Sequence, residues 1–195
     1  KESKSVKSVL KKASGREGDY RTMSYELIAG DPDTEVVHKE HGYSILVDPQ
    51  KAFFSVREGT DRQRIAKSVK PGEVVMVMFA GVGPYAIAIG KAQPEVEKVI
   101  AVEINPDAVE YMRHNIRVNK LSHKIVPVLG DAMVECGRWY GKCDRVVMPL
   151  PMSATSFLSV AASCAKKGGV IHLYSSGSRD EPYKEAETAV DESLK

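Results

Sequence analysis

The feature that most constrains the fold is an alternation of apolar runs with amphipathic stretches in the middle of the chain. The runs are residues 74–80, 99–102 and 125–129. Each is followed directly by glycine or an acid, and Pro106 stands where it would open a helix between the second run and the third. The apolar stripe of that helix would be Val109, Met112 and Ile116. Such alternation predicts an α/β fold, a doubly wound and mostly parallel sheet with helices on both faces.

The pattern continues toward the end of the chain. Apolar residues at helical spacing predict a helix over residues 154–165, which we expect Gly168 and Gly169 to terminate. Residues 170–174 then read as a fifth, buried strand. A doubly wound sheet usually continues beyond a last helix such as residues 181–194, so we expect further strands C-terminal to this sequence.

The first part of the chain has a different pattern. Residues 25–57 consist of short apolar stretches broken by turns. Antiparallel strands are predicted at Val36 and Val37 and at residues 43–47. A helix is expected over residues 59–69 with Thr60 as its N-cap. We therefore divide the chain into a small α+β domain, residues 1–58, and a larger sheet domain, residues 59–195.

Length and composition exclude several classes of protein. The 195 residues suffice for one substantial core with a small appendage, and the initial lysine suggests a piece of a longer protein. No apolar stretch approaches the ~20 residues that span a bilayer. The three cysteines lack the spacing of a zinc site and suit a reducing cytosol. We expect a cytoplasmic, monomeric protein without a metal or a membrane.

The net charge of +2 does not by itself indicate a nucleic-acid partner. However, residues 1–21 hold seven bases against three acids. Such a stretch could meet phosphates, because binding releases condensed counterions, and it could equally be a solvated terminus.

Glycines and acids at the predicted strand ends suggest a nucleoside site. Gly81 and Gly83 would let backbone N–H groups approach a ligand, and Glu103 could accept both ribose hydroxyls. Asp131 follows the third run, where it could accept an adenine amino group. The alternatives are structural: glycines for tight packing, Glu103 as a helix-entry acid, and Asp131 as an ordinary N-cap.

The cofactor could be NAD or S-adenosylmethionine, since both carry a ribose. Three features favour S-adenosylmethionine. Asn105 and Pro106 come directly after the acid, Asp131 closes the third strand, and a stiff turn of Met148, Pro149, Leu150 and Pro151 follows the fourth.

Longer motifs resemble a known family. They are Met78 to Tyr85, Glu103 to Pro106, Asn115 with Asn119 to Leu121, and Gly169 to Tyr174, with further likeness at Asp19 to Arg21, Leu27 to Gly30, Thr34 to His38 and Phe53 to Arg62. Together they resemble the archaeal and eukaryotic tRNA guanosine-37 N1-methyltransferases, a family that includes wybutosine-pathway enzymes transferring an aminocarboxypropyl group. The resemblance implies a class I methyltransferase domain using S-adenosylmethionine, preceded by a small domain that helps hold the anticodon stem-loop of tRNA.

The resemblance also implies roles for particular residues. Arg21 would stabilise charge developing on guanine O6, and Asp61 would take the N1 proton. Pro149 would border the target base. Arg21, Asp61 and Pro149 together form the expected catalytic set. The residues expected to line the cofactor are Phe53, Arg62, Phe79, Gly81, Gly83, Glu103, Ile104, Asn105, Asp131, Ala132 and Met148.

Three positions depart from the family pattern. Asp61 stands where glutamate is usual, Pro149 where asparagine is usual, and Val77 where an acid is usual. These departures keep alternatives open: an aminocarboxypropyl transferase on the same cofactor, a relative that binds RNA without turnover, or, more remotely, an NAD enzyme.

Overall fold

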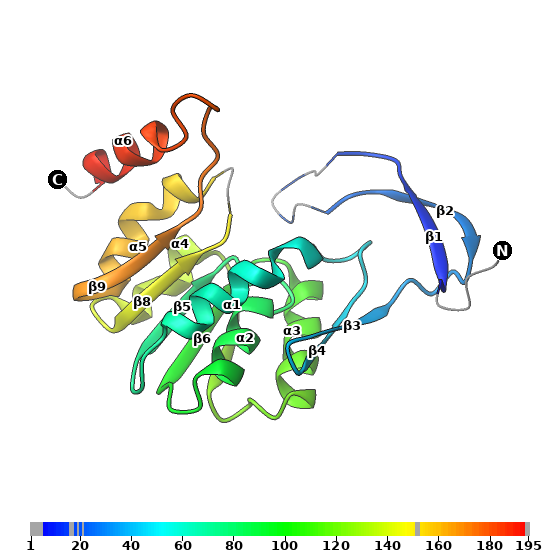
Figure 1. The fold of residues 1–195 in the computed structure, drawn as a ribbon, viewed down its shortest axis with the longest axis horizontal. Helices are drawn as coiled ribbons and strands as arrows, with labels where there is room; N and C mark the ends of the chain where they lie inside the picture. Colours follow the sequence, from blue (N-terminus) through cyan, green and yellow to red (C-terminus); the bar gives the residue numbers. More distant parts are fainter. Residues whose placement is uncertain (1–5, 16–17, 19, 21, 151–152, 194–195) are drawn as a thin grey trace.

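The computed structural model describes residues 6–15, 18, 20, 22–150 and 153–193. Within these ranges lies a five-stranded parallel sheet with the strand order β7-β6-β5-β8-β9 (Figure 1). Its strands are β5 (Val74–Met78), β6 (Lys98–Glu103), β7 (Ile125–Leu129), β8 (Cys143–Met148) and β9 (Ala165–Leu173). The order reverses between β5 and β8, so the chain winds outward in both directions from the centre, as the sequence predicts.

Helices cover both faces of the sheet. Those packed in the first of two core clusters are α1 (Gly59–Ser68), α2 (Pro84–Ala92) and α3 (Pro106–Val118). The second cluster includes α4 (Ala132–Glu135), the 3-10 helices η2 (Cys136–Trp139) and η3 (Ala154–Phe157), α5 (Leu158–Cys164) and α6 (Lys184–Ser193). Val75 and Val77 belong to the first cluster, whereas Met76 and Met78 belong to the second. This division follows from the strand period of two and explains why β5 is apolar along its length.

Two antiparallel pairs precede the sheet; the sequence predicted the second pair, β3–β4, but not the β1–β2 pair. The strands are β1 (Ser8–Lys12), β2 (Tyr25–Gly30), β3 (Val36–Glu40) and β4 (Tyr43–Val47), followed by the 3-10 helix η1 (Val56–Glu58). The β1–β2 pair extends away from the large sheet, whereas β3 and β4 lie beside α3 (Figure 1). Tyr43, Ile45 and Val47 of β4 are buried in the first core cluster. The β3–β4 hairpin thus shares a core with the large sheet, and the domain boundary at residue 58 stays a prediction.

Two helix ends differ from the prediction. Thr60 is not the N-cap of α1, because η1 runs directly into the helix and the cap position falls on Glu58. The last core helix ends at Cys164 rather than at Gly168 and Gly169. Both glycines instead lie in β9, where the pairing with β8 shifts register between Cys143 and Arg145. The two glycines therefore lie in a bulge of the strand rather than at a helix cap.

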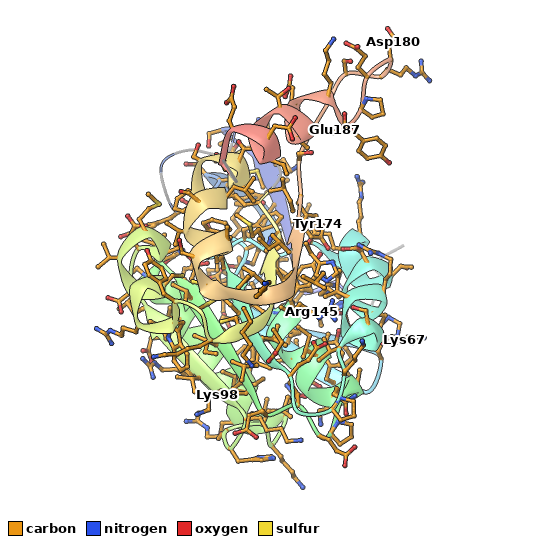
Figure 2. All side chains as sticks on the ribbon, turned by 90° about the vertical axis from the view of Figure 1, so that its left-hand side faces the viewer. Lys67, Lys98, Arg145, Tyr174, Asp180 and Glu187 are labelled. Atoms are coloured by element: carbon orange, nitrogen blue, oxygen red, sulfur yellow. The ribbon has the colours of Figure 1, made fainter. Side chains whose placement is uncertain are left out.

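The fifth strand is longer and less buried than predicted. β9 spans Ala165–Leu173, and none of its residues is fully buried, because it forms the edge of the sheet among the described strands. Arg145 near the start of β8 and Tyr174 just past the end of β9 lie at different heights in the side view (Figure 2). Tyr174 therefore belongs to the carboxyl edge of the sheet, where the predicted site residues gather. Within the described ranges, no helix has the length and apolar character to cross a membrane.

Candidate functional site

The turn between β5 and α2 has the backbone geometry expected of a ligand cradle. Gly81 and Gly83 have φ angles of +55° and +87°, the left-handed region that glycine adopts without steric cost. A Cβ on Gly83 would lie 2.9 Å from Cγ of Met112. Pro84 then opens α2, whose first turn has backbone N–H groups without partners inside the helix. Gly83 is buried and allows close packing on α3, whereas Gly81 is the partly exposed glycine of the turn.

Glu103 closes this turn from the neighbouring strand. Its Oε2 accepts a 2.7 Å hydrogen bond from the Gly81 backbone N–H, and its Oε1 accepts one of 2.8 Å from the Asn105 N–H. Burial raises the pKa of the Glu103 carboxyl, although the backbone N–H groups of Asn105 and Gly81 counteract it. No cation pairs with Glu103 among the described residues. Each carboxylate oxygen keeps a further acceptor position that a ribose hydroxyl could fill.

Phe79 carries backbone strain at the same place. Its φ is +54°, an uncommon conformation for a bulky residue and one that costs about 1–3 kcal/mol. The ring packs edge-on against Phe157, with centroids 4.8 Å apart. Strain of this kind is typical of functional turns, which agrees with the predicted role of Phe79 beside the cofactor.

A loop from the first part of the chain lies over the crevice. Asn105 Nδ2 donates to the Lys51 carbonyl at 2.8 Å, and Asn105 Oδ1 caps α3 by accepting from the Asp107 N–H at 3.0 Å. This tether brings the Phe53 carbonyl within 3.5 Å of where a Cβ on Gly81 would lie. Phe53 also lines a small cavity of about 140 Å³ with Phe54 and with Tyr25 of β2. The Asn105 side chain is therefore occupied structurally, the Phe53 backbone lies beside the glycine turn, and the contact of Phe53 with a cofactor stays a prediction.

Residues at the carboxyl ends of β7 and β8 complete the carboxyl edge of the sheet. Asp131 is exposed and caps α4 by accepting from the Met133 N–H at 2.8 Å, so the N-cap alternative describes part of its role. Ala132 is buried behind it, and Ile104 is partly exposed. Met148 requires a correction, because its side chain is wholly buried in the second core cluster and cannot contact a cofactor. Pro149, directly after β8, is partly exposed.

Arg62 also requires a correction. Its side chain is fully buried, with Nε and Nη2 donating to Glu40 at 2.8 and 2.7 Å and Nη1 donating to the Ser55 carbonyl at 3.0 Å. Partial burial alone would raise the pKa of Glu40, but hydrogen bonds from Arg62 and Tyr43 lower it to about 2. The Arg62 guanidinium therefore fastens α1 to the β3–β4 hairpin and has no nitrogen left to reach a cofactor.

Asp61, the adjacent residue, is partly exposed on the first turn of α1. Its Oδ2 accepts from the hydroxyl groups of Tyr85 (3.0 Å) and Tyr174, and its Oδ1 accepts from Arg64 Nε (2.8 Å). Burial would raise the pKa of Asp61, but the bonds from Tyr174, Arg64 and Tyr85 outweigh it and lower that pKa. Sequence reasoning gave no role to either tyrosine. The available signals were their positions, directly after the glycine turn and directly after a strand.

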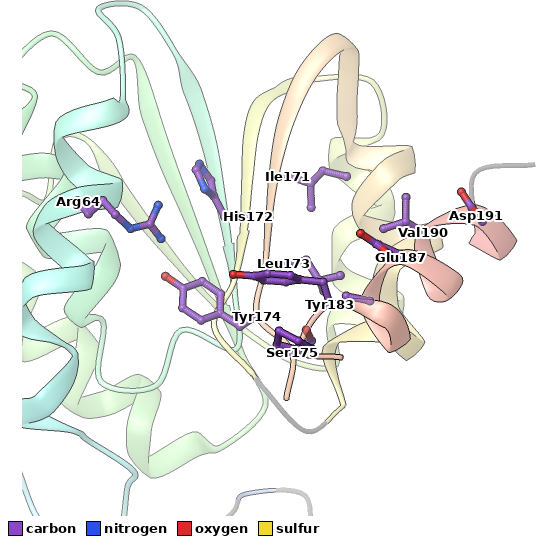
Figure 3. A pocket seen from close by; sticks show the side chains of 12 residues that line it. Arg64, Ile171, His172, Leu173, Tyr174, Ser175, Tyr183, Glu187, Val190 and Asp191 are labelled. Carbon is purple, nitrogen blue, oxygen red and sulfur yellow. The ribbon is translucent and has the colours of Figure 1, made fainter. Parts of the chain in front are cut away.

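A groove opens beside this cluster, between α1, the edge strand β9 and α6. Its volume is about 690 Å³, with Arg64, His172 and Tyr174 toward α1 and Tyr183 and Glu187 on the α6 side (Figure 3). Burial and the nearby Arg145 guanidinium lower the pKa of His172 to about 4, so the imidazole is neutral at physiological pH. The groove follows the sheet edge rather than the glycine turn, and it is separate from the nucleoside crevice.

Two predicted features have no structural description. Four of the seven bases in residues 1–21 lie outside the described residues, and Arg21 is one of these four. Of the described ones, Lys7 pairs with Asp33 at 2.6 Å and Lys11 with Glu26 at 3.2 Å. Within the described ranges, no group of three or more potential ligand side chains could hold a metal ion.

The crevice fits an adenosyl cofactor on chemical grounds. Glu103 supplies a buried acceptor for ribose hydroxyls, the glycine turn leaves room for a close approach, and Asp131 offers a carboxylate at the next strand. Comparison with protein families gives one match, in which residues 36–194 fit the TRM5/TYW2 methyltransferase domain. The chain belongs to this family.

Relatives within the family match most of this chain in sequence and in fold. The tRNA (guanine(37)-N(1))-methyltransferase Trm5b of Pyrococcus abyssi is 44% identical over 181 residues, covering 92% of this chain and 52% of that protein. The solved complex of aTrm5 and tRNALeu superposes with a TM-score of 0.86 at 39% identity, covering 95% of this chain and 53% of that one. M. jannaschii TYW2 in complex with AdoMet gives 0.76 at 29% identity, with coverages of 87% and 77%. The chain spans about half the length of the curated relatives it matches.

Proposed function

We propose that this chain is the catalytic part of a tRNA methyltransferase that modifies N1 of guanosine 37 with S-adenosylmethionine. The observation that carries the proposal is the Glu103 carboxylate, buried without a cation and bonded to the Gly81 and Asn105 N–H groups at the tip of β6. A group of this kind suits a ribose. The similarity to Trm5b of Pyrococcus abyssi supports the choice of reaction.

S-adenosylmethionine supplies an electrophilic methyl carbon on its sulfonium. The part left to the protein is to raise the nucleophilicity of guanine N1, which is poor while its proton remains. Asp61 would accept that proton, because it stays ionised at neutral pH and its side chain is 30% exposed. Arg21 would stabilise the charge that moves to O6, and Pro149 would border the base.

The remaining parts of the proposal concern partners. We assign residues 1–58 to positioning the anticodon stem-loop of tRNA, and we expect the enzyme to be monomeric and cytoplasmic. The similarity to aTrm5, solved with tRNALeu, supports a tRNA partner.

A second candidate is aminocarboxypropyl transfer in the wybutosine pathway. The observation in its favour is that TYW2, a relative of the same fold, was solved with the same cofactor. Pro149 in place of the asparagine usual in the methyltransferases points the same way. The two reactions differ in which carbon of the donor is attacked, so cofactor orientation decides between them.

A transfer assay with two labels separates the candidates. The native protein is incubated with a tRNA transcript bearing guanosine 37 and with donor labelled either on its methyl group or on its carboxyl carbon. Methyl label in RNA, lost when guanosine 37 is changed to adenosine, supports the proposal. Carboxyl label alone identifies the second candidate. No label in either reaction, with donor binding intact, indicates a relative that binds RNA without turnover.

A further inference from the structure

The Asp61 carboxylate is held by a residue of its own helix and by two groups that are distant in the sequence. Tyr85 of α2 and Tyr174, just past β9, both donate to Oδ2. Their hydroxyl groups lie 3.2 Å apart, and their rings meet edge-on with centroids 6.0 Å apart. On the other side, Arg64 Nε and Nη2 lie 2.8 and 2.7 Å from Oδ1. The carboxylate orientation is therefore fixed from both sides.

This arrangement ties the carboxylate to the first turn of α2 through the Tyr85 hydroxyl. Tyr85 is the second residue of α2 and follows Gly83 and Pro84 directly, and its side chain is only 3% exposed. A phenol so buried has little freedom to follow a moving partner, so it defines where Oδ2 lies. Figure 3 shows Tyr174 at the end of the groove nearest to Arg64.

The chemistry of a general base gives this restraint a purpose. Aspartate is one methylene shorter than glutamate, so its reach to a substrate proton depends more on where its backbone and carboxylate are held. Displacement of a reacting group by about 1 Å can cost ~10²-fold in rate. An aspartate on a first helical turn would otherwise sample several rotamers.

We propose that Tyr174 and Tyr85 are positioning residues, which hold the Asp61 carboxylate at the crevice in the orientation needed to take the substrate proton. The inference rests on the proposed function, in which Asp61 is the base. The other titratable or charged groups near the cluster are Arg64 of α1, Glu58 before it, and His172 of β9. A purely structural alternative is that each phenol, buried for Tyr85 and partly buried for Tyr174, simply needs a hydrogen-bond partner.

Kinetics of phenylalanine variants test the proposal, since phenylalanine keeps the ring and removes only the hydroxyl. In the native protein, Tyr174→Phe should lower kcat about tenfold or more while leaving KM for tRNA and for S-adenosylmethionine within about twofold. Tyr85→Phe should act in the same direction. Tyr183→Phe is the matched control, because Tyr183 lines the same groove from the α6 side and is 71% exposed; its kcat should equal that of the wild type.

A double-mutant cycle shows whether Tyr174 acts through Asp61. In an Asp61→Asn background, the further change Tyr174→Phe should have almost no effect on kcat, because the group it positions is already gone. An equal loss in both backgrounds would overturn the proposal. Carboxyl NMR of ¹³C-labelled aspartate, assigned with Asp61→Asn, adds a readout without turnover: Tyr174→Phe should move the Asp61 titration to higher pH, and an unmoved titration would contradict the bond.

The proposed function and the positioning role of the tyrosines can be refuted separately. A wild-type protein that transfers no methyl label refutes the proposed function, and the role of the tyrosines falls with it. A wild-type protein that transfers methyl label, with Tyr174→Phe unchanged in kcat and in titration, refutes only the inference.

Discussion

Asn115 of α3 and Asn119, which caps its C-terminal end, bond the β3–β4 hairpin to this helix, and removing Asn115 should destabilise the protein strongly. Asn115 Oδ1 accepts from the Leu46 N–H at 2.8 Å, and Nδ2 donates to the Leu46 carbonyl at 3.0 Å and to the Val82 carbonyl at 3.1 Å. Asn119 bonds the Ser44 N–H and carbonyl in the same way, at 3.1 and 2.7 Å. The spacing explains the match, because four helical residues rise ~6.0 Å and two strand residues ~6.6 Å.

The size of the loss in stability follows from the backbone groups that Asn115→Ala leaves without a hydrogen-bond partner. Asn115 is fully buried, so the change strands one N–H and two carbonyls in the interior. An unsatisfied buried group costs about 1–3 kcal/mol, and relaxation or an entering water would recover part of this. We expect a loss of about 3–5 kcal/mol in the free energy of unfolding, a large share of the ~5–15 kcal/mol typical of a domain.

Urea unfolding at constant m measures this loss. Asn115→Asp is the matched variant: it keeps one acceptor but sets a carboxylate against two carbonyls, so it should cost at least as much. Arg113→Ala on the exposed side of α3 is the control and should stay within about 0.5 kcal/mol. A loss below about 1 kcal/mol for Asn115→Ala would refute the view that the side-chain amide completes the β4 edge.

Three further changes test the site. Glu40→Gln removes the close counter-charge of the buried Arg62, leaving Glu58 at 3.8 Å, and should cost about 3 kcal/mol or more. The folded-state pKa of Glu40 is depressed to about 2, so its contribution is present above the ordinary pKa and lost as pH falls from about 4.5 toward 2; the stability difference from wild type in urea titrations should shrink over that window. Gly83→Ala places a Cβ against Met112 at positive φ, and calorimetry should show weaker S-adenosylmethionine binding, whereas unchanged affinity would argue against the cradle. Glu103→Gln should reduce that affinity about tenfold or more with stability largely kept, and equal binding by both proteins would remove Glu103 from the ribose site.

The sequence determined the sheet and the crevice to a large extent. Apolar runs of strand length between amphipathic stretches can bury both faces of each strand only in a parallel sheet with helices on either side, and β5, β6 and β7 lie where that pattern puts them. Gly81, Gly83 and Glu103 could be read locally, because a positive φ favours glycine and an acid at a strand tip faces the crevice. These features depend on neighbours within a few residues, so periodicity and spacing reveal them.

Only the tertiary structure decided the contacts between residues that are distant in the sequence. Asp61 meets Tyr174, 113 positions away, because the strand order brings the end of β9 beside α1. Arg62 turns inward to Glu40 because the β3–β4 hairpin packs on the same core, although its neighbour on the helix is partly exposed. Met148 is buried because it still belongs to β8 and points to the face of the sheet that the later helices cover. Spacing along a chain specifies which side chains share an element, whereas the packing of elements specifies which of them meet.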